Sequence, residues 1–215
     1  MDLIHFFVDF ILHLDRHLGD LITRFGAGSY AILALIVFCE TGLVVTPFLP
    51  GDSLLFAAGA FAGLGSLDPW TLTFVIIGAV ILGDNVNYWL GRYLGPRAFS
   101  GDYRFFRKEY LERTHRFFEK HGGKTVMLAR YVPIVRTFTP FVAGIGAMPY
   151  PRFFAYSVGG GITWVSLFIW AGYFFGNLPA VRHNFTLVIM GIIVVSVLPM
   201  VFEFLRARRE ASRAA

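Results

Sequence analysis

Long apolar runs separated by short polar stretches are the main pattern of this sequence. Four runs, at residues 30–45, 71–94, 153–175 and 185–205, approach or exceed the roughly 20 residues that a helix needs to cross a bilayer. The pattern therefore predicts an all-α polytopic membrane protein with about four spanning helices. Its length suits one domain, so residues 1–215 are expected to form a single membrane domain.

Two further segments are amphipathic rather than apolar throughout. In residues 1–26, apolar positions recur at helical spacing and charged positions fall on the other face. In residues 97–124, which are rich in Lys and Arg, Phe106, Tyr110 and Phe117 share one helical face. Both patterns predict helices that lie in the membrane interface.

Proline interrupts two other apolar segments, around residues 46–63 and 125–148. Proline breaks or begins a helix, so neither segment is expected to span as one continuous helix. We predict two re-entrant helical hairpins that dip into the bilayer from opposite sides. The residues expected to shape their tips are Pro50, Gly51, Pro133 and Pro140, with Pro140 in the first turn of the returning helix.

The two halves of the chain also resemble each other in glycine spacing. Three glycines in the first half match three in the second at a constant offset of 81, namely Gly78, Gly91 and Gly95 with Gly159, Gly172 and Gly176. Since the matched segments are expected to run in opposite directions, this predicts an inverted repeat. Broken segments at corresponding positions of such halves indicate a transporter binding site. The alternative is that glycine, common in membrane helices, recurs by chance.

Composition and charge agree with a membrane location. Charged residues make up 15% of the chain, against roughly 25% in soluble domains, and the mean hydropathy is +0.61. The net charge is +5, but Lys and Arg flank the apolar runs, so a nucleic-acid partner is not expected. The basic loop at 97–124 and the basic tail at 206–215 should be cytoplasmic. With the run 30–45 leading outward, both termini are expected to be cytoplasmic.

Cysteine and histidine give no indication of a metal or cofactor site. The lone Cys39 excludes a disulfide framework and a thiolate metal cluster. The six His residues fall in loops or interfacial segments, and none forms a metal-ligand pair on a membrane helix. We therefore expect no metal and no cofactor.

Four ionisable residues occur in apolar surroundings: Glu40, Asp52, Arg130 and Arg136. A charge at the centre of a membrane helix costs roughly 2.5–3.5 kcal/mol even on a lenient scale, so these four are expected to pair or to face water. We predict a shared polar site near the midplane. The alternatives are snorkelling to an interface or a structural ion pair, and Asp52 also suits the N-cap of a helix.

The residue types in this predicted site favour an anion. Arg130 and Arg136 supply forked donors that match a phosphate group, and two helix N-termini at hairpin tips would add partial positive charge. The carboxylates either hold the guanidinium groups in place or bind protons. Asp84, inside the run 71–94, either faces this site or bonds locally with the neighbouring Asn85 and Asn87.

Three stretches of the chain resemble the signatures of the bacterial DedA family. They are FCETG with PFLPGDSLL at 38–55, GDNVNY at 83–88, and RYVPIVRT with PFVAG at 130–144. The resemblance covers essentially the whole chain. It implies a bacterial inner-membrane protein with two facing re-entrant helices, related to eukaryotic lipid scramblases of the VTT-domain type. The family's essential acidic and basic pairs match Glu40 and Asp52, and Arg130 and Arg136.

These observations favour a flippase-like transporter for an anionic lipid. The resemblance implies undecaprenyl phosphate as the leading substrate and a link to the proton-motive force, so membrane lipid and protons are the expected partners. A homo-oligomer is left open. The main alternative is a proton-coupled antiporter for cations or drugs. An enzyme is not expected, because lipid-phosphate hydrolysis usually needs a positioned His or metal, and a scaffold would gain nothing from buried charges.

Overall fold

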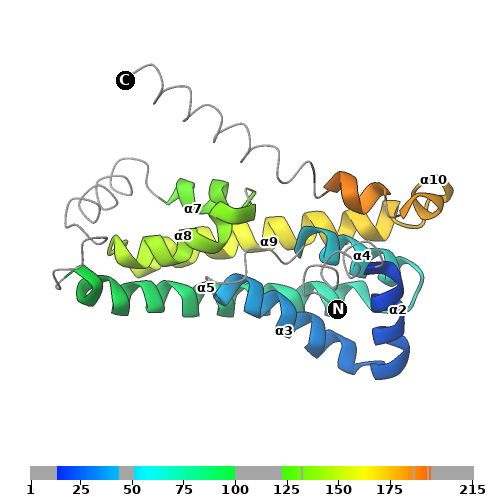
Figure 1. Ribbon diagram of the computed structural model, residues 1–215, viewed down its shortest axis with the longest axis horizontal. Coiled ribbons are helices and arrows are strands. Elements are labelled where there is room, and N and C mark those ends of the chain that lie inside the picture. Colours follow the sequence, from blue (N-terminus) through cyan, green and yellow to red (C-terminus); the bar gives the residue numbers. More distant parts are fainter. Residues whose placement is uncertain are drawn as a thin grey trace, which may run out of the picture.

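The computed structural model is helical throughout the part of the chain that it describes, and no strand occurs there (Figure 1). The described residues are 14–43, 51–99, 123–131, 133–185, 187–192 and 194. The helices are α2 (Leu14–Phe25), α3 (Gly28–Gly42), α4 (Gly51–Gly63), α5 (Pro69–Phe99), α7 (Lys124–Ala129), α8 (Pro133–Ile145), α9 (Tyr150–Phe175) and α10 (Pro179–His183). The all-α prediction is confirmed for these residues.

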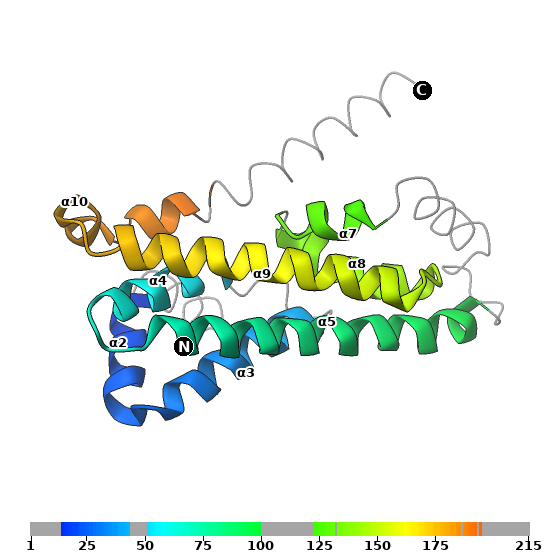
Figure 2. The same cartoon turned by 180° about the vertical axis from the view of Figure 1, so that it is seen from behind.

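The two longest helices, α5 and α9, lie side by side and run in opposite directions (Figures 1 and 2). Trp70 at the start of α5 stacks edge-on against Trp170 near the end of α9, with ring centroids 4.9 Å apart. Further along α5, the ring of Tyr88 stacks on Phe153 near the start of α9, at 4.4 Å. These two contacts fix the antiparallel alignment of the pair.

Both long helices are apolar and long enough to cross a membrane, as expected for the runs 71–94 and 153–175. They are the two such helices found among the described residues. The predicted span at 185–205 lies mostly outside the described residues, and its described residues, 185, 187–192 and 194, are helical. The predicted number of about four spans therefore stays a prediction.

Helices α3 and α4 form an antiparallel hairpin beside α5. The backbone N–H of Asp68, just before α5, donates to the hydroxyl oxygen of Tyr30 at 2.6 Å, so α3 and α5 begin at the same end. Gly42, at the end of α3, lies against Gly83, halfway along α5. The prediction that residues 30–45 span in the direction opposite to 71–94 is therefore wrong. An apolar run is equally compatible with a span or with one arm of a hairpin, and only contacts fix its direction.

A second hairpin, made of α7 and α8, approaches from the other end of the molecule. The tips of the two hairpins meet halfway along α5, where Arg136 in the first turns of α8 bonds Asp52 in the first turn of α4. Proline shapes this hairpin differently from the prediction. Pro133 begins α8, where its fixed φ suits a first turn. Pro140 lies inside α8 and not at its start, so the carbonyl of Arg136 lacks its usual helical donor.

Each hairpin packs against the long helix of the other half through a pair of glycines. On α4 and α9, Gly59 faces the carbonyl of Ile169, and Gly172 faces that of Phe56. On α5 and α8, Gly91 faces the carbonyl of Phe141, and Gly144 faces that of Tyr88. Without a Cβ at these positions, the two backbones approach as closely as in small-xxx-small helix pairs. Gly91 and Gly172 are partners in the predicted repeat, and they make equivalent contacts.

Helix α2 packs across the end of the molecule at which α5 begins, next to α4 (Figure 2). Leu18 and Ile22 on one face of α2 are buried, while Arg16 and Asp20 are exposed, which confirms an amphipathic helix in the described part of residues 1–26. This end is opposite to the one from which the chain enters residues 97–124. The expectation that α2 and this basic loop share a side is therefore wrong. The N-terminus itself, most of 97–124 and the tail 206–215 lie outside the described residues.

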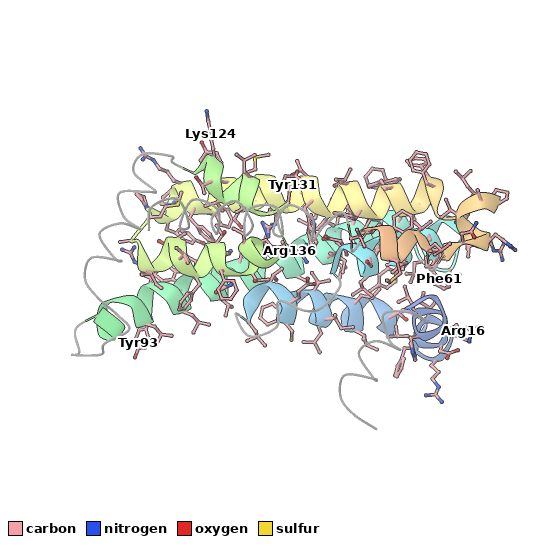
Figure 3. All side chains as sticks on the ribbon, turned by 45° about the horizontal axis from the view of Figure 1, so that its top comes forward. Arg16, Phe61, Tyr93, Lys124, Tyr131 and Arg136 are labelled. Carbon is pink, nitrogen blue, oxygen red and sulfur yellow. The ribbon has the colours of Figure 1, made fainter. Side chains whose placement is uncertain are left out.

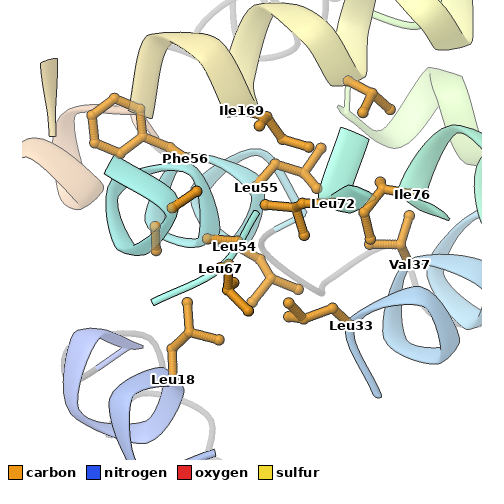
Figure 4. Close-up of a cluster of buried hydrophobic side chains, with 14 of the residues drawn as sticks. Leu18, Leu33, Val37, Leu54, Leu55, Phe56, Leu67, Leu72, Ile76 and Ile169 are labelled. Atoms are coloured by element: carbon orange, nitrogen blue, oxygen red, sulfur yellow. The ribbon is translucent and has the colours of Figure 1, made fainter. Parts of the chain in front are cut away.

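The main hydrophobic core lies between α2, α3, α4, α5 and α9 (Figure 4). Leu33 and Val37 of α3, Leu55 of α4, Leu72 and Ile76 of α5 and Ile169 of α9 are all almost fully buried in this core. At its edge Asp68 caps α5, because its carboxylate accepts the backbone N–H of Thr71 at 2.7 Å. Hydrogen bonds from the Thr71 side chain and backbone hold the pKa of Asp68 below its usual range. The core thus fixes the first hairpin on the two long helices.

Candidate functional site

Five ionisable side chains are buried together between the hairpin tips. The exposed fraction is 1% for Glu40, 2% for Asp84, 6% for Arg130 and 8% for both Asp52 and Arg136. Arg136 lies near the middle of the molecule's length in Figure 3. The four charged residues singled out in the sequence are thus neither on the outer rim nor far apart, and Asp84 joins them.

Arg136 joins the two hairpins through two carboxylates. Its Nη1 donates to Asp52 Oδ1 at 2.5 Å, and its Nη2 donates to Glu40 Oε1. Glu40 stands near the end of α3 and Asp52 in the first turn of α4, so one guanidinium group holds both arms of the opposite hairpin. Charge-assisted bonds from a forked guanidinium are among the strongest in proteins. Charge-assisted hydrogen bonds therefore connect the two tips directly.

The close approach at the first tip depends on Gly51, the first residue of α4. A Cβ at this position would overlap the carboxylate of Glu40. The backbone N–H of Gly51 also interacts with that carboxylate. Gly51 thus leaves the space into which the Glu40 side chain turns, while Pro50 lies outside the described residues.

Trp164 of α9 completes the surroundings of Arg136, and the sequence reasoning missed it. Its Nε1–H donates to Asp52 Oδ1 at 2.9 Å. The Arg136 guanidinium carbon lies 4.4 Å from the centre of the same indole ring, a cation–π distance. The available signal was a tryptophan in the middle of an apolar run, since membrane tryptophans usually lie near the interfaces.

Arg130 forms a second buried pair with Asp84. Arg130 Nη2 donates to Asp84 Oδ2 at 2.6 Å, and its Nη1 donates to the backbone carbonyl of Ser157 at 3.1 Å. The Ser157 hydroxyl donates to the same Asp84 oxygen. Arg136 is near enough to act electrostatically on both Arg130 and Asp84. The two pairs are therefore neighbouring parts of one cluster.

The alternative in which Asp84 bonds locally with its asparagine neighbours is wrong. Asn85 donates to the carbonyl of Ile81 and accepts from the hydroxyl of Tyr150. Asn87 is fully buried and donates to the carbonyls of Thr41 at 3.0 Å and Thr137 at 2.7 Å. Asn87 thereby ties α3 and α8, one arm of each hairpin, to α5. Its position three residues from Asp84 does not reveal this role.

The cluster contains more acidic than basic groups. Three carboxylates (Glu40, Asp52, Asp84) face two guanidinium groups, which leaves one net negative charge when all are ionised. Three polar atoms of the cluster have no hydrogen-bond partner within the described part of the chain, namely Glu40 Oε2, Arg130 Nε and Arg136 Nε, and the same holds for Ser53 Oγ and Asn87 Oδ1. A buried net charge is costly, so a proton or a bound ligand would find both charge and free polar groups here.

Comparisons with known proteins place this chain among bacterial membrane proteins. The sequence pattern of the VTT domain matches residues 49–174, which include α4 of the first hairpin and the whole of the second. Four of the five charged residues lie within this match, namely Asp52, Asp84, Arg130 and Arg136. The chain is 58% identical to "Protein DedA" of Escherichia coli strain K12, over the full length of both chains. It is 43% identical to an uncharacterized membrane protein of Mycobacterium leprae, over 89% of this chain and 86% of that one. It is 34% identical to "Inner membrane protein YqjA" of E. coli, over 70% and 69%. No solved structure matches the chain.

Proposed function

This chain belongs to the VTT-domain, or DedA, family of membrane proteins, and on that premise we propose that it moves an anionic lipid head group across the bacterial inner membrane. The observation that carries the proposal is the buried cluster in which Arg136 bridges the tips of two opposed hairpins. Guanidinium groups deep between apolar helices match a phosphate in both charge and geometry. Undecaprenyl phosphate is the substrate that we propose.

We place the cluster inside the hydrocarbon, with the two hairpins re-entrant from opposite sides. Aromatic pairs flank it at two levels, Trp70 with Trp170 and Trp89 with Tyr150. At about 1.5 Å per residue, Trp70 and Trp89 lie about 28 Å apart along α5, close to the thickness of a bilayer core. Tryptophan and tyrosine favour the two interfaces. With residues 97–124 cytoplasmic, the loop between α4 and α5 faces outward.

A proton and a lipid phosphate would favour each other's binding in this mechanism. Arg136 already donates to Glu40 and Asp52, so a phosphate must compete with these carboxylates for the same N–H groups. A proton on one carboxylate removes its charge and weakens its hold on the guanidinium. Arg136 is then free to bind the phosphate, and the bound phosphate in turn favours the protonated carboxylate.

Lipid translocation should therefore follow an imposed pH gradient and should lose this dependence when the carboxylates are made permanently neutral. In proteoliposomes containing undecaprenyl phosphate, the double variant Glu40→Gln/Asp52→Asn should lower the gradient-driven rate at least about tenfold. The measurement is the fraction of lipid phosphate accessible from outside over time. Asp20→Asn, at an exposed position of α2, is the control and should behave like the unchanged protein. Full gradient-driven activity in the double variant would rule out the coupling.

A second candidate function is a proton-coupled antiporter for cations or drugs. The excess of one carboxylate over the guanidinium groups favours it, because a cation would neutralise the remaining charge. The same proteoliposomes distinguish the two functions. Proton-driven cation flux without movement of lipid phosphate would support the antiporter and contradict lipid transport.

The re-entrant arrangement predicts the side on which three exposed residues react with a membrane-impermeant maleimide. In a Cys39→Ala background, Ala27→Cys before α3 and Ser66→Cys after α4 should both be labelled from outside the intact cell. Lys124→Cys, at the start of α7, should be labelled only after the membrane is opened. Labelling of positions 27 and 66 from opposite sides would mean that residues between them cross the membrane, and the hairpin would not be re-entrant.

A further inference from the structure

A pocket of about 290 Å³ lies away from the charge cluster, at the end of the molecule where α5 begins. Its walls come from α2, the end of α4, the end of α9 and the chain around α10. The residues that line it are Arg16, Ala60, Phe61, Leu64, Gly176, Asn177, Arg182 and Phe185. Figure 3 shows Arg16 and Phe61 together at this end, with Arg136 in the middle of the molecule. None of the five cluster residues contributes to the pocket.

Two arginines from distant parts of the chain face this pocket, and no acidic side chain lines it. Arg16 comes from α2 and Arg182 from α10. Both are exposed, and neither guanidinium group has a hydrogen bond or an ion pair with any residue that the structure describes. Two guanidinium groups that share a pocket without a counter-charge repel each other, and an anion between them removes this repulsion.

The remaining walls of the pocket are mostly apolar, and packing and a hydrogen bond hold them in place. Phe61, Leu64 and Phe185 supply hydrophobic surface beside the arginines. Asn177 Nδ2 donates to the carbonyl of Ala60 at 2.8 Å, which fastens the end of α9 to α4. Phe61 also lies against Gly19 of α2. The pocket thus places two arginines beside an apolar surface, and this combination fits an anionic group attached to a hydrocarbon chain.

The depth of the pocket agrees with a lipid head group. Leu64 precedes and Asn177 follows the aromatic pair of Trp70 and Trp170, so the pocket lies just beyond that pair. Aromatic residues of this kind lie at the level of the head groups. The volume of about 290 Å³ is just below the roughly 300–1,000 Å³ typical of ligand pockets, which admits a head group but not whole acyl chains.

The geometry points to a binding site for the phosphate group of a membrane lipid between Arg16 and Arg182, with the first carbon atoms of the lipid on Leu64 and Phe185. Binding here does not require transport. In the orientation proposed above, this end faces outward, and the pocket then receives the lipid phosphate from the outer leaflet before it reaches Arg136. That second step rests on the proposed function.

Binding is tested with the purified full-length chain and three probes of defined chemistry. They are dihexanoyl phosphatidic acid, dihexanoylglycerol, which lacks the phosphate, and inorganic phosphate. Phosphatidic acid should bind, and its affinity should fall at least about tenfold in Arg16→Gln/Arg182→Gln and at 0.5 M salt. Arg24→Gln, at an exposed position on α2 that does not line the pocket, should leave the affinity unchanged.

Leu64→Ser separates lipid phosphate from free phosphate. It should weaken phosphatidic acid binding and leave any binding of inorganic phosphate unchanged, because Leu64 would contact only the hydrocarbon in the proposed site. Equal binding of phosphatidic acid and dihexanoylglycerol, or unchanged affinity in the double arginine variant, would overturn the inference. Inorganic phosphate binding as tightly as phosphatidic acid would overturn the lipid assignment. Arg136→Met should abolish translocation yet keep phosphatidic acid binding in the pocket. The two measurements therefore distinguish a failure of the transport proposal from a failure of the binding inference.

Discussion

Replacing Arg136 by methionine should abolish lipid translocation and destabilise the protein by about 3–5 kcal/mol, because two buried carboxylates lose their partner. Glu40 and Asp52 are 1% and 8% exposed, and both bond this guanidinium. Trp164 would also lose its cation–π contact. The measurements are thermal unfolding in detergent, followed by tryptophan fluorescence, and phosphate accessibility in proteoliposomes. Arg152→Met removes an exposed arginine of α9 and should change neither.

A triple variant separates the structural role of Arg136 from its proposed role in transport. In Glu40→Gln/Asp52→Asn/Arg136→Met no charge of this group remains, so much of the lost stability should return. Translocation should stay absent, since no guanidinium remains at the tip of α8 to bind phosphate. A triple variant that transports lipid would contradict the proposed role of Arg136. An Arg136→Met protein as stable as the unchanged one would contradict the buried pairing itself.

Gly172→Ala should destabilise the protein, and the same substitution at Gly159 of the same helix should not. A Cβ at Gly172 would overlap the carbonyl of Phe56, so α4 and α9 would have to separate. Overpacking of this kind costs about 1–3 kcal/mol, and more where backbone must move. A Cβ at Gly159 meets nothing within 4 Å, and alanine there should stabilise the helix by about 0.5–1 kcal/mol. Thermal unfolding of both variants in one detergent measures the difference.

The equivalent test on α5 uses Gly91→Ala with Gly78→Ala as its control. Gly91 faces the carbonyl of Phe141, while a Cβ at Gly78 has open space. Because Gly91 and Gly78 correspond to Gly172 and Gly159 at the offset of 81, the two helices should respond alike. If the crossing variant and its control on the same helix lost equal stability, the glycine crossing would not hold the hairpins in place.

Part of this structure could be predicted from the sequence, because some physical costs depend on one segment alone. A long apolar run is stable only as a buried or membrane helix, and α5 and α9 lie where the runs 71–94 and 153–175 indicated. A charge within such a run is costly wherever the helix lies, which singled out Glu40, Asp52, Arg130 and Arg136 before any contact was known. Their burial together agrees with that reasoning.

Other features depend on which segments meet, and no single segment carries that information. Arg136 bonds Asp52 and Glu40, which precede it in the sequence by 84 and 96 positions. Asp84 pairs with Arg130 rather than with its asparagine neighbours. The direction of α3, the place of Pro140 inside α8 and the part played by Trp164 likewise follow from packing. The physical reason is that backbone approach at the glycine crossings sets which side chains come within bonding distance. The sequence by itself thus determined where helices form and which charges need partners, and only the tertiary structure decided which partners they have.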